Sequence, residues 1–216
     1  MNGYIIGALA MASATLAPSV AAARPVTYPG GTMSMAEHRD EATMVETVHT
    51  LSPRLGVGWH DEWDHEDDWQ FHGPMIAGLA RRWNMPDAQA NIFWMAGAGA
   101  AFDDVASAGG PAKPAAYASV EADWENRRFY TQYQARAFWA EDIDRTFTQR
   151  WRAGVAPYVA EAGALHAWAI LQVDHEPEDA DPVSLTPMVR VFKGAALAEA
   201  GVSLDGDAFA AFMIYF

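Results

Sequence analysis

The sequence predicts an all-β protein, a transmembrane antiparallel up-and-down β-barrel of about 12 strands. Segments of about ten residues with alternating apolar and polar character recur along the chain, and turn residues separate them. Past the N-terminal segment, no apolar run reaches the roughly 18 residues typical of a membrane-spanning helix. A chain that crosses a membrane without such helices has to cross it as a closed barrel, because open strand edges would leave backbone groups unpaired in lipid.

The alternation places apolar and aromatic side chains on one face and small, polar or arginine side chains on the other. In RLGVGWHDEW, the residues Leu55, Val57 and Trp59 share one face. In TFTQRWRAGVAPYV and YTQYQARAFWAE, Trp151 and Trp139 lie on the apolar face, opposite the arginines. This pattern is inside out relative to a soluble barrel, so the apolar face is expected to meet lipid.

Turn residues between the alternating segments divide the chain into an even number of strands, as bacterial barrels require. The short connections would lie on the periplasmic side, and the longer, mostly acidic ones would face outward. Ten strands would also satisfy this parity if the first hairpin lay outside the wall. The predicted strands cover residues 32–37, 42–51, 54–63, 69–83, 89–102, 115–125, 128–140, 145–158, 164–174, 183–193, 196–204 and 207–216.

The last strand carries a candidate assembly signal. Phe216, Ile214 and Phe212 alternate along it with a period of two, which indicates a strand with one wholly apolar face. This pattern resembles the C-terminal signal of bacterial outer-membrane β-barrels, a terminal Phe preceded by alternating apolar residues. The resemblance implies the outer-membrane assembly machinery as a partner, together with outer-membrane lipid and lipopolysaccharide.

The N-terminal residues 1–23 are interpreted as a secretory signal peptide, because an uncharged apolar stretch is followed by Pro18 and small residues. The mature chain, residues 24–216, is then a single barrel domain. We expect it in the outer membrane of a Gram-negative bacterium.

Charge and cysteine content exclude two classes of function. The chain has 28 acidic and 14 basic residues and a net charge of -14, which disfavours a nucleic-acid partner. It contains no cysteine, so disulfides, thiolate metal sites and cysteine nucleophiles are excluded.

Charged residues on the predicted inner faces have two interpretations. Arg136, Arg150 and Arg152 lie on neighbouring strands, and Glu121 and Asp123 on the strand before them. They could form an internal salt-bridge network that fills a narrow barrel. Alternatively, the three arginines could form a cationic constriction that selects small anions. The sequence favours the first interpretation and leaves the second open.

Histidines beside carboxylates predict a candidate transition-metal site in the external loops. Imidazole and carboxylate groups suit Zn²⁺, Ni²⁺ or Cu²⁺, and thioethers suit Cu(I). Ordinary solvated acidic loops that bind divalent ions loosely are the alternative. We therefore expect Cu or Zn, if bound, at the rim loops, with a ligand set drawn from His38, His60, His65, His175, Asp64, Glu66, Asp174, Met33 and Met35.

Four stretches, TYPGG, DWQFHG, RRWNMPDAQAN and LQVDHEPEDADPVSLTPMVRVFKG, resemble a group of small, uncharacterised proteobacterial exported proteins. That group is loosely associated with heavy-metal and copper-resistance loci. The resemblance implies a link to metal handling and assigns no ligand or catalytic residue.

The sequence thus predicts an outer-membrane barrel that acts as a narrow channel or surface component, with a link to copper handling. One alternative is an outer-membrane lipid-modifying enzyme, for which Ser34 and His38 form the nearest nucleophile and base pair. The other is a soluble periplasmic β-protein that binds a small apolar ligand.

Overall fold

The chain forms one closed barrel of twelve antiparallel strands in the computed structural model, which describes residues 25–103, 110–161 and 163–216. Each strand pairs with its neighbours in sequence, and β12 returns to pair with β1. The all-β fold class and the strand number predicted from the sequence are confirmed. The strands are β1 Thr32–Arg39, β2 Ala42–Ser52, β3 Leu55–Asp64, β4 Trp69–Asn84, β5 Ala88–Asp103, β6 Lys113–Asn126, β7 Phe129–Ala140, β8 Asp144–Val155, β9 His166–His175, β10 Val183–Lys193, β11 Ala196–Val202 and β12 Ala208–Tyr215.

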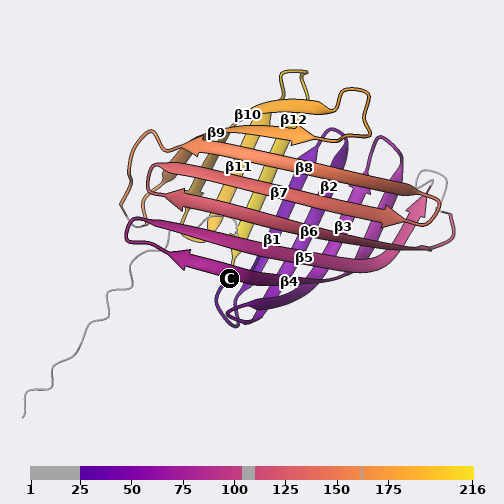
Figure 1. Ribbon diagram of the computed structural model, residues 1–216, viewed down its shortest axis with the longest axis horizontal. Helices are drawn as coiled ribbons and strands as arrows, with labels where there is room; N and C mark the ends of the chain where they lie inside the picture. The colour runs from indigo at the N-terminus through magenta and orange to yellow at the C-terminus, as the bar shows by residue number, and fades with distance from the viewer. Residues whose placement is uncertain (1–24, 104–109, 162) are drawn as a thin grey trace, which may run out of the picture.

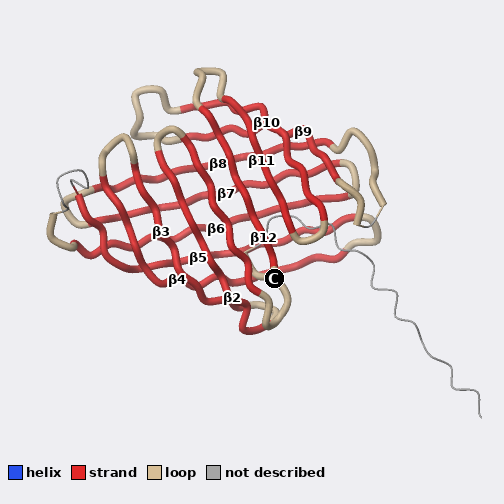
Figure 2. Tube along the Cα trace, turned by 180° about the vertical axis from the view of Figure 1, so that it is seen from behind, coloured by secondary structure: helices blue, strands red, loops and turns tan. Residues whose placement is uncertain are grey.

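Two walls that cross at an angle make up the barrel. In Figure 1, β5 to β8 run across the near wall, and β2, β3 and β12 pass behind them. Figure 2 shows the same barrel from behind, with strands throughout the wall and loops at its ends. None of the described residues forms a helix that is long and apolar enough to cross a membrane. The predicted signal peptide, residues 1–23, lies outside the described residues.

The strand boundaries differ from the predicted ones by a few residues. The largest difference is in β8, which was expected to run to residue 158 and ends at Val155. Pro157 follows closely and cannot donate a backbone hydrogen bond to a neighbouring strand. Arg54, which the alternation places on the inner face, lies in the turn before β3 and is exposed.

Large apolar side chains cover the outside of the wall, as the alternation predicts. Trp59 is 48% exposed, Trp151 44% and Val189 56%, although each lies in the middle of a strand. Their inward neighbours are buried, because successive side chains of a strand point to opposite faces of the sheet. The outer wall therefore presents a surface suited to lipid.

Aromatic rings fill one side of the lumen near the ends of β4 and β7. Trp69 and Phe138 stack with their ring centroids 4.7 Å apart. Phe71 meets Phe138 and Tyr117 edge-on, at 5.8 Å and 6.0 Å. These offset and edge-to-face contacts are the favourable geometries for aromatic pairs, and they pack this part of the lumen solidly.

The segment before β1 folds into one mouth of the barrel. Val26 is 2% exposed and belongs to the apolar core of the lumen. The backbone N–H of Thr27 donates to the hydroxyl of Thr50 at 3.0 Å, close to the turn between β2 and β3. This mouth is the one that the short turns surround.

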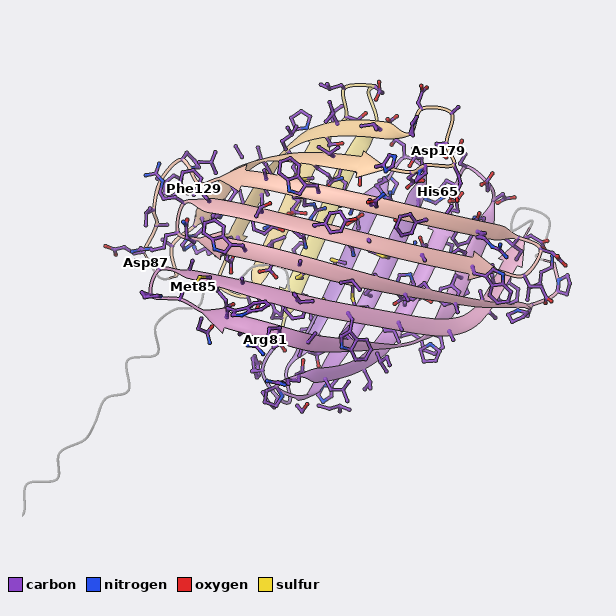
Figure 3. All side chains as sticks on the ribbon, viewed as in Figure 1. His65, Arg81, Met85, Asp87, Phe129 and Asp179 are labelled. Carbon is purple, nitrogen blue, oxygen red and sulfur yellow. The ribbon has the colours of Figure 1, made fainter. Side chains whose placement is uncertain are left out.

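The two mouths are lined by different connections. Met85 and Asp87 in a short turn, and Phe129 beside the next short turn, lie at one end of the barrel in Figure 3. His65 and Asp179, in the loops expected to face outward, lie at the other end. We call the first end the turn mouth and the second the loop mouth. This arrangement follows the alternation of short and long connections in the sequence.

Phe216 provides a test of the seam between β1 and β12. The N–H of Thr32 donates to the Phe216 carbonyl at 2.7 Å, and the N–H of Phe216 donates to the Thr32 carbonyl at 3.0 Å. Deleting Phe216 removes both bonds where the sheet closes, and unpaired backbone groups in a membrane cost several kcal/mol each. We expect a much smaller fraction of compact, fast-migrating barrel in unboiled gel samples, both in cells and after refolding in detergent.

Phe216→Ala distinguishes the role of the aromatic ring from the role of the two backbone hydrogen bonds, because it removes the ring and keeps both bonds. If the ring is the assembly signal, this variant should assemble poorly in cells and refold normally in detergent. Phe129→Ala, an exposed aromatic at the same mouth, is the control and should behave like the wild type. Normal assembly of the Phe216 deletion in cells would contradict both roles.

Candidate functional site

The lumen holds most of the buried charge of the protein and is the candidate functional site. Arg136, Arg150, Arg152, Glu121 and Asp123 all lie on inward-facing positions of β6, β7 and β8. Their placement follows from the period of two along each strand. Whether they fill the barrel or select a solute depends on their partners.

A first set of charged contacts surrounds His60 on β3. Its Nδ1 lies 2.8 Å from Glu46 Oε1, and its Nε2 lies 3.1 Å from Glu62 Oε2. The ring satisfies both carboxylates when each nitrogen carries a proton. Arg136 reaches across from β7 and donates to both oxygens of Glu62, with its guanidinium 5.2 Å from the centre of the Tyr117 ring. We call these residues the histidine group: His60, Glu46, Glu62 and Arg136.

A second set of ion pairs lies around β8. Arg150 donates to Glu37 at 2.8 Å and to Asp174 at 2.6 Å. Arg152 donates to Glu199 at 3.4 Å. These pairs join β8 to β1, β9 and β11 and hold several strands together through charge-assisted hydrogen bonds. We call this set the arginine group: Arg150, Arg152, Arg190, Glu37, Asp174 and Glu199.

Arg190 completes the arginine group on the side of β10. Its Nε donates to Glu199, and its guanidinium lies over the ring of Tyr130 at 4.6 Å. Glu199 thus accepts from two arginines, Arg190 and Arg152. Such shared pairing keeps a buried carboxylate from being left uncompensated, which would be strongly destabilising.

A cavity of about 80 Å³ lies between the two groups. Arg136 borders it from the histidine group, and Arg150 and Arg152 border it from the arginine group. Glu121 also lines it, whereas Asp123 accepts a hydrogen bond from the Asn91 side chain at 2.8 Å. The three arginines that the sequence singled out therefore do meet at one place in the lumen.

Several residues predicted to ligate a metal lie elsewhere than expected. The expectation that His60 lies in or beside an external loop, as part of a site at the rim, is wrong, because it is fully buried in the lumen within β3. Asp174 also faces the lumen, paired with Arg150. Met33 and Met35 face the lumen from β1, and Met33 pairs with Tyr215 near the turn mouth. The physical reason is strand parity, which alternates these side chains with outward-facing neighbours.

The remaining predicted ligands do lie at or near the loop mouth. His38 and His65 have their ring centroids 6.1 Å apart. His175 contacts the Gln149 side chain at 3.1 Å. Asp64 accepts hydrogen bonds from the backbone N–H of Glu66 and of Asp67, so it stabilises a turn. Among the described residues, no three His, Asp or Glu side chains form a group that could hold a metal ion, and the metal site stays a prediction.

One outward-facing contact was not predicted from the sequence. The hydroxyl of Thr43 on β2 lies 2.8 Å from His38 Nδ1 and 2.8 Å from His65 Nε2. Ser34, which with His38 is the nearest nucleophile and base pair in the sequence, contacts Thr47 at 3.0 Å. The register explains both pairs, because His38 is opposite Thr43 and Ser34 is opposite Thr47. Register could not be read from the alternation alone.

An acidic pocket of about 70 Å³ lies at the loop mouth, beside Arg39. Burial raises the pKa of Glu176 to about 7 against the opposing effect of Arg39, and the carboxylates of Asp179 and Glu41 add to the rise. Burial also raises the pKa of Glu41, again opposed by Arg39. Protonation at this mouth should therefore change near neutral pH.

The closed wall, its apolar outer surface and its ion-paired lumen define the class of protein: a closed antiparallel β-barrel of the kind that spans membranes. Among solved structures, KdgM porin in complex with disordered oligogalacturonate is similar over 86% of this chain and 98% of its own, with 6% identity and a TM-score of 0.51. A second KdgM porin structure aligns over 86% of this chain and 98% of its own at 7% identity, with a TM-score of 0.49. LpxR from Salmonella typhimurium aligns over 86% of this chain and 99% of its own at 8% identity, with a TM-score of 0.46.

At these identities, the likeness to KdgM porin establishes the fold alone. No protein-family model matches the sequence, and the comparison with curated proteins finds no match.

Glu176→Gln tests the protonation of the loop mouth. Between about pH 4.5 and 7, Glu176 keeps its proton in the folded barrel, whereas in the unfolded chain, where its pKa is near 4.5, it has released it. The barrel therefore loses stability as the pH rises from about 4.5 to about 7. Above about pH 8 we expect Glu176→Gln to exceed the wild type in free energy of unfolding by about 1–2 kcal/mol, because one pKa unit corresponds to about 1.4 kcal/mol and solvent partly screens the group.

Urea unfolding of the barrel in detergent, followed by tryptophan fluorescence, measures this difference. Below about pH 4 the two proteins should unfold alike, since Glu176 is then mostly neutral in both the folded and the unfolded chain. Glu66→Gln, exposed in a neighbouring loop, is the control and should show no such crossover. A stability difference that is independent of pH would refute the raised pKa of Glu176.

Proposed function

We propose that the protein is an outer-membrane channel for small polar solutes, narrowed at mid-lumen by Arg136, Arg150 and Arg152. The observation that carries the proposal is the cavity between the histidine group and the arginine group. Three guanidinium groups border this space, and the lumen is otherwise packed by aromatic rings and ion pairs. A solute that passes has to pass these arginines.

The outer wall supports placement in a membrane. Trp139 and Phe147 are each 40% exposed, and Phe212 is 50% exposed, on strands whose inner faces carry charge. Transmembrane strands need about 9–11 residues when tilted, and the central strands β2 to β10 supply 10 to 16. In a soluble β-protein, this many exposed aromatic side chains would have to be buried against another protein surface instead of lipid.

The likeness to KdgM porin supports passage through the lumen. That porin is described in complex with oligogalacturonate, and it shares the closed barrel with this chain. In this chain the charged groups are largely paired, so the passage is narrow and is expected to conduct small ions and solutes rather than long chains.

Arg150→Gln/Arg152→Gln tests the constriction in planar lipid bilayers. Both substitutions remove a guanidinium beside the cavity and leave Glu37, Asp174 and Glu199 with fewer cationic partners. We expect single-channel conductance to rise roughly severalfold and the reversal potential in a KCl gradient to shift toward cation selectivity. Glutamine keeps hydrogen-bonding capacity, which favours folding.

The control is Arg145→Ala, on the same strand but exposed near the loop mouth. It should leave conductance and selectivity unchanged. Each variant is first shown to fold by its mobility in unboiled gels. If the folded wild type and the double variant show no conductance, or if both show the same selectivity, the constriction is not formed by these arginines.

A second candidate function is modification of membrane lipid at the loop mouth, favoured by the contacts of Thr43. A hydroxyl held between two imidazoles donates its proton to one ring and accepts from the other, which is the arrangement of a nucleophile with its base. His38 and His65 are exposed on the outside of the barrel. Thr43 would attack the carbonyl carbon of a lipid ester, an imidazole would pass the proton to the leaving alkoxide, and water would then hydrolyse the acyl-threonine.

Covalent labelling with a fluorophosphonate probe tests this second candidate, with mass spectrometry of the peptide that contains Thr43. Thr43→Ser should keep labelling and the release of fatty acid from phospholipid micelles, and Thr43→Val should abolish both. Thr47→Val, which removes a hydroxyl from the same outer face, should change neither. Equal fatty-acid release by Thr43→Val and the wild type would exclude the role.

A further inference from the structure

The mid-lumen cavity has one polar wall and one apolar wall. The polar wall is formed by Ser119 on β6, Arg136 on β7 and Arg152 on β8. The hydroxyl of Ser119, Nε of Arg136 and Nη2 of Arg152 are buried and make no hydrogen bond with the protein. Buried polar atoms normally have a partner, so three donors without one, on residues that line the same cavity, indicate a place for a ligand or for water.

The carboxylates around the cavity do not occupy these donors. Glu37 Oε2 lies 3.9 Å from Arg152 Nη2, which is too far for a hydrogen bond. Glu46 is engaged by His60. Glu121 contributes a single buried oxygen without a partner, Oε1. Donors therefore outnumber acceptors among the unpaired atoms, which favours a ligand that brings acceptor oxygens.

The apolar wall consists of thioether side chains, most of them from β1, β2 and β12 across the barrel, and one, Met95, from β5 beside Ser119. Methionine is flexible and polarisable, and it adapts to apolar groups of varied shape. Sulfur accepts hydrogen bonds only weakly, so this wall offers little to a second charged end of a ligand. The methionines that line the cavity are Met33, Met35, Met44, Met95 and Met213.

We propose that this cavity binds a small monocarboxylate with a short apolar tail, its carboxylate toward Ser119, Arg136 and Arg152 and its tail against the methionines. The inference rests on the proposed channel function and names a class of solute for it. Planar carboxylates match the guanidinium geometry of arginine. The volume of about 80 Å³ is between two and three times the roughly 30 Å³ that one water molecule occupies in the liquid, which suits only a small molecule.

The two walls also discriminate between ligands of similar size. Sulfate or phosphate would turn charged oxygens toward thioether groups that cannot donate to them. A neutral amide with the same tail would lack the charge that makes hydrogen bonds to arginine strong. Butyrate meets both walls, so it is the probe, with sulfate and butyramide as comparison ligands.

Isothermal titration calorimetry of the refolded barrel in detergent measures binding without a membrane or an ion gradient. We expect butyrate to bind and sulfate and butyramide to give no saturable heat. Ser119→Ala removes one donor and should weaken butyrate binding about tenfold. Met213→Phe, on β12 across the cavity from the donors, fills the apolar side and should weaken butyrate more than formate, which has no tail. Ser34→Ala, a serine on the outer wall, should bind as the wild type does.

The outcomes separate this inference from the channel proposal. A folded wild type that gives no saturable heat with butyrate, or a Ser119→Ala variant that binds butyrate as tightly, overturns the inference. Equal affinity for sulfate and butyrate overturns it as well. Conductance in bilayers with no butyrate binding leaves the channel standing without this site, and binding without conductance refutes the channel alone.

Discussion

Backbone pairing around the closed wall is the constraint on which the rest of the structure depends. In lipid an unpaired N–H or C=O costs several kcal/mol, so the last strand has to return to the first. β12 and β1 pair from Met33 opposite Tyr215 to Arg39 opposite Phe209. Once the wall is closed, each strand side chain points either to the outside or to the lumen. The apolar surface and the charged interior are two consequences of this one closure.

Closure of the wall leaves charged side chains in a narrow interior, and they have to find partners across it. Arg136 on β7 reaches Glu62 on β3, and Arg150 on β8 reaches Glu37 on β1. These strands belong to the two walls that cross in Figure 1. The ion pairs therefore link the walls, and removing one member would leave a buried charge without compensation. The histidine group and the arginine group act as cross-links between the walls of the barrel.

Stability and passage are coupled in such a lumen. The ion pairs that join the walls also border the cavity, so the narrowing that a solute would meet is made from structural contacts. A few donors are not consumed by these contacts, among them the hydroxyl of Ser119 and Nη2 of Arg152. Groups that the fold does not use internally are the ones available for a ligand. The two interpretations of the lumen arginines, filling and selection, are thus compatible, because one side chain, such as Arg152, has both ion-paired and unpaired nitrogen atoms.

The sequence by itself determined the β-strand architecture, a strand number of about twelve with ten still open, and the inward face of most strands, because alternation is a local property of consecutive residues. The same parity places His60 and Met33 in the lumen, where the loop-based metal hypothesis did not expect them. Only the tertiary structure decided the partners: Arg136 and Glu62 are 74 residues apart, and Arg150 and Glu37 are 113 apart. It also decided the contacts of Thr43. The ion pairs and the contacts of Thr43 depend on strand register and on closure of the whole wall, which cannot be predicted from a short stretch of sequence.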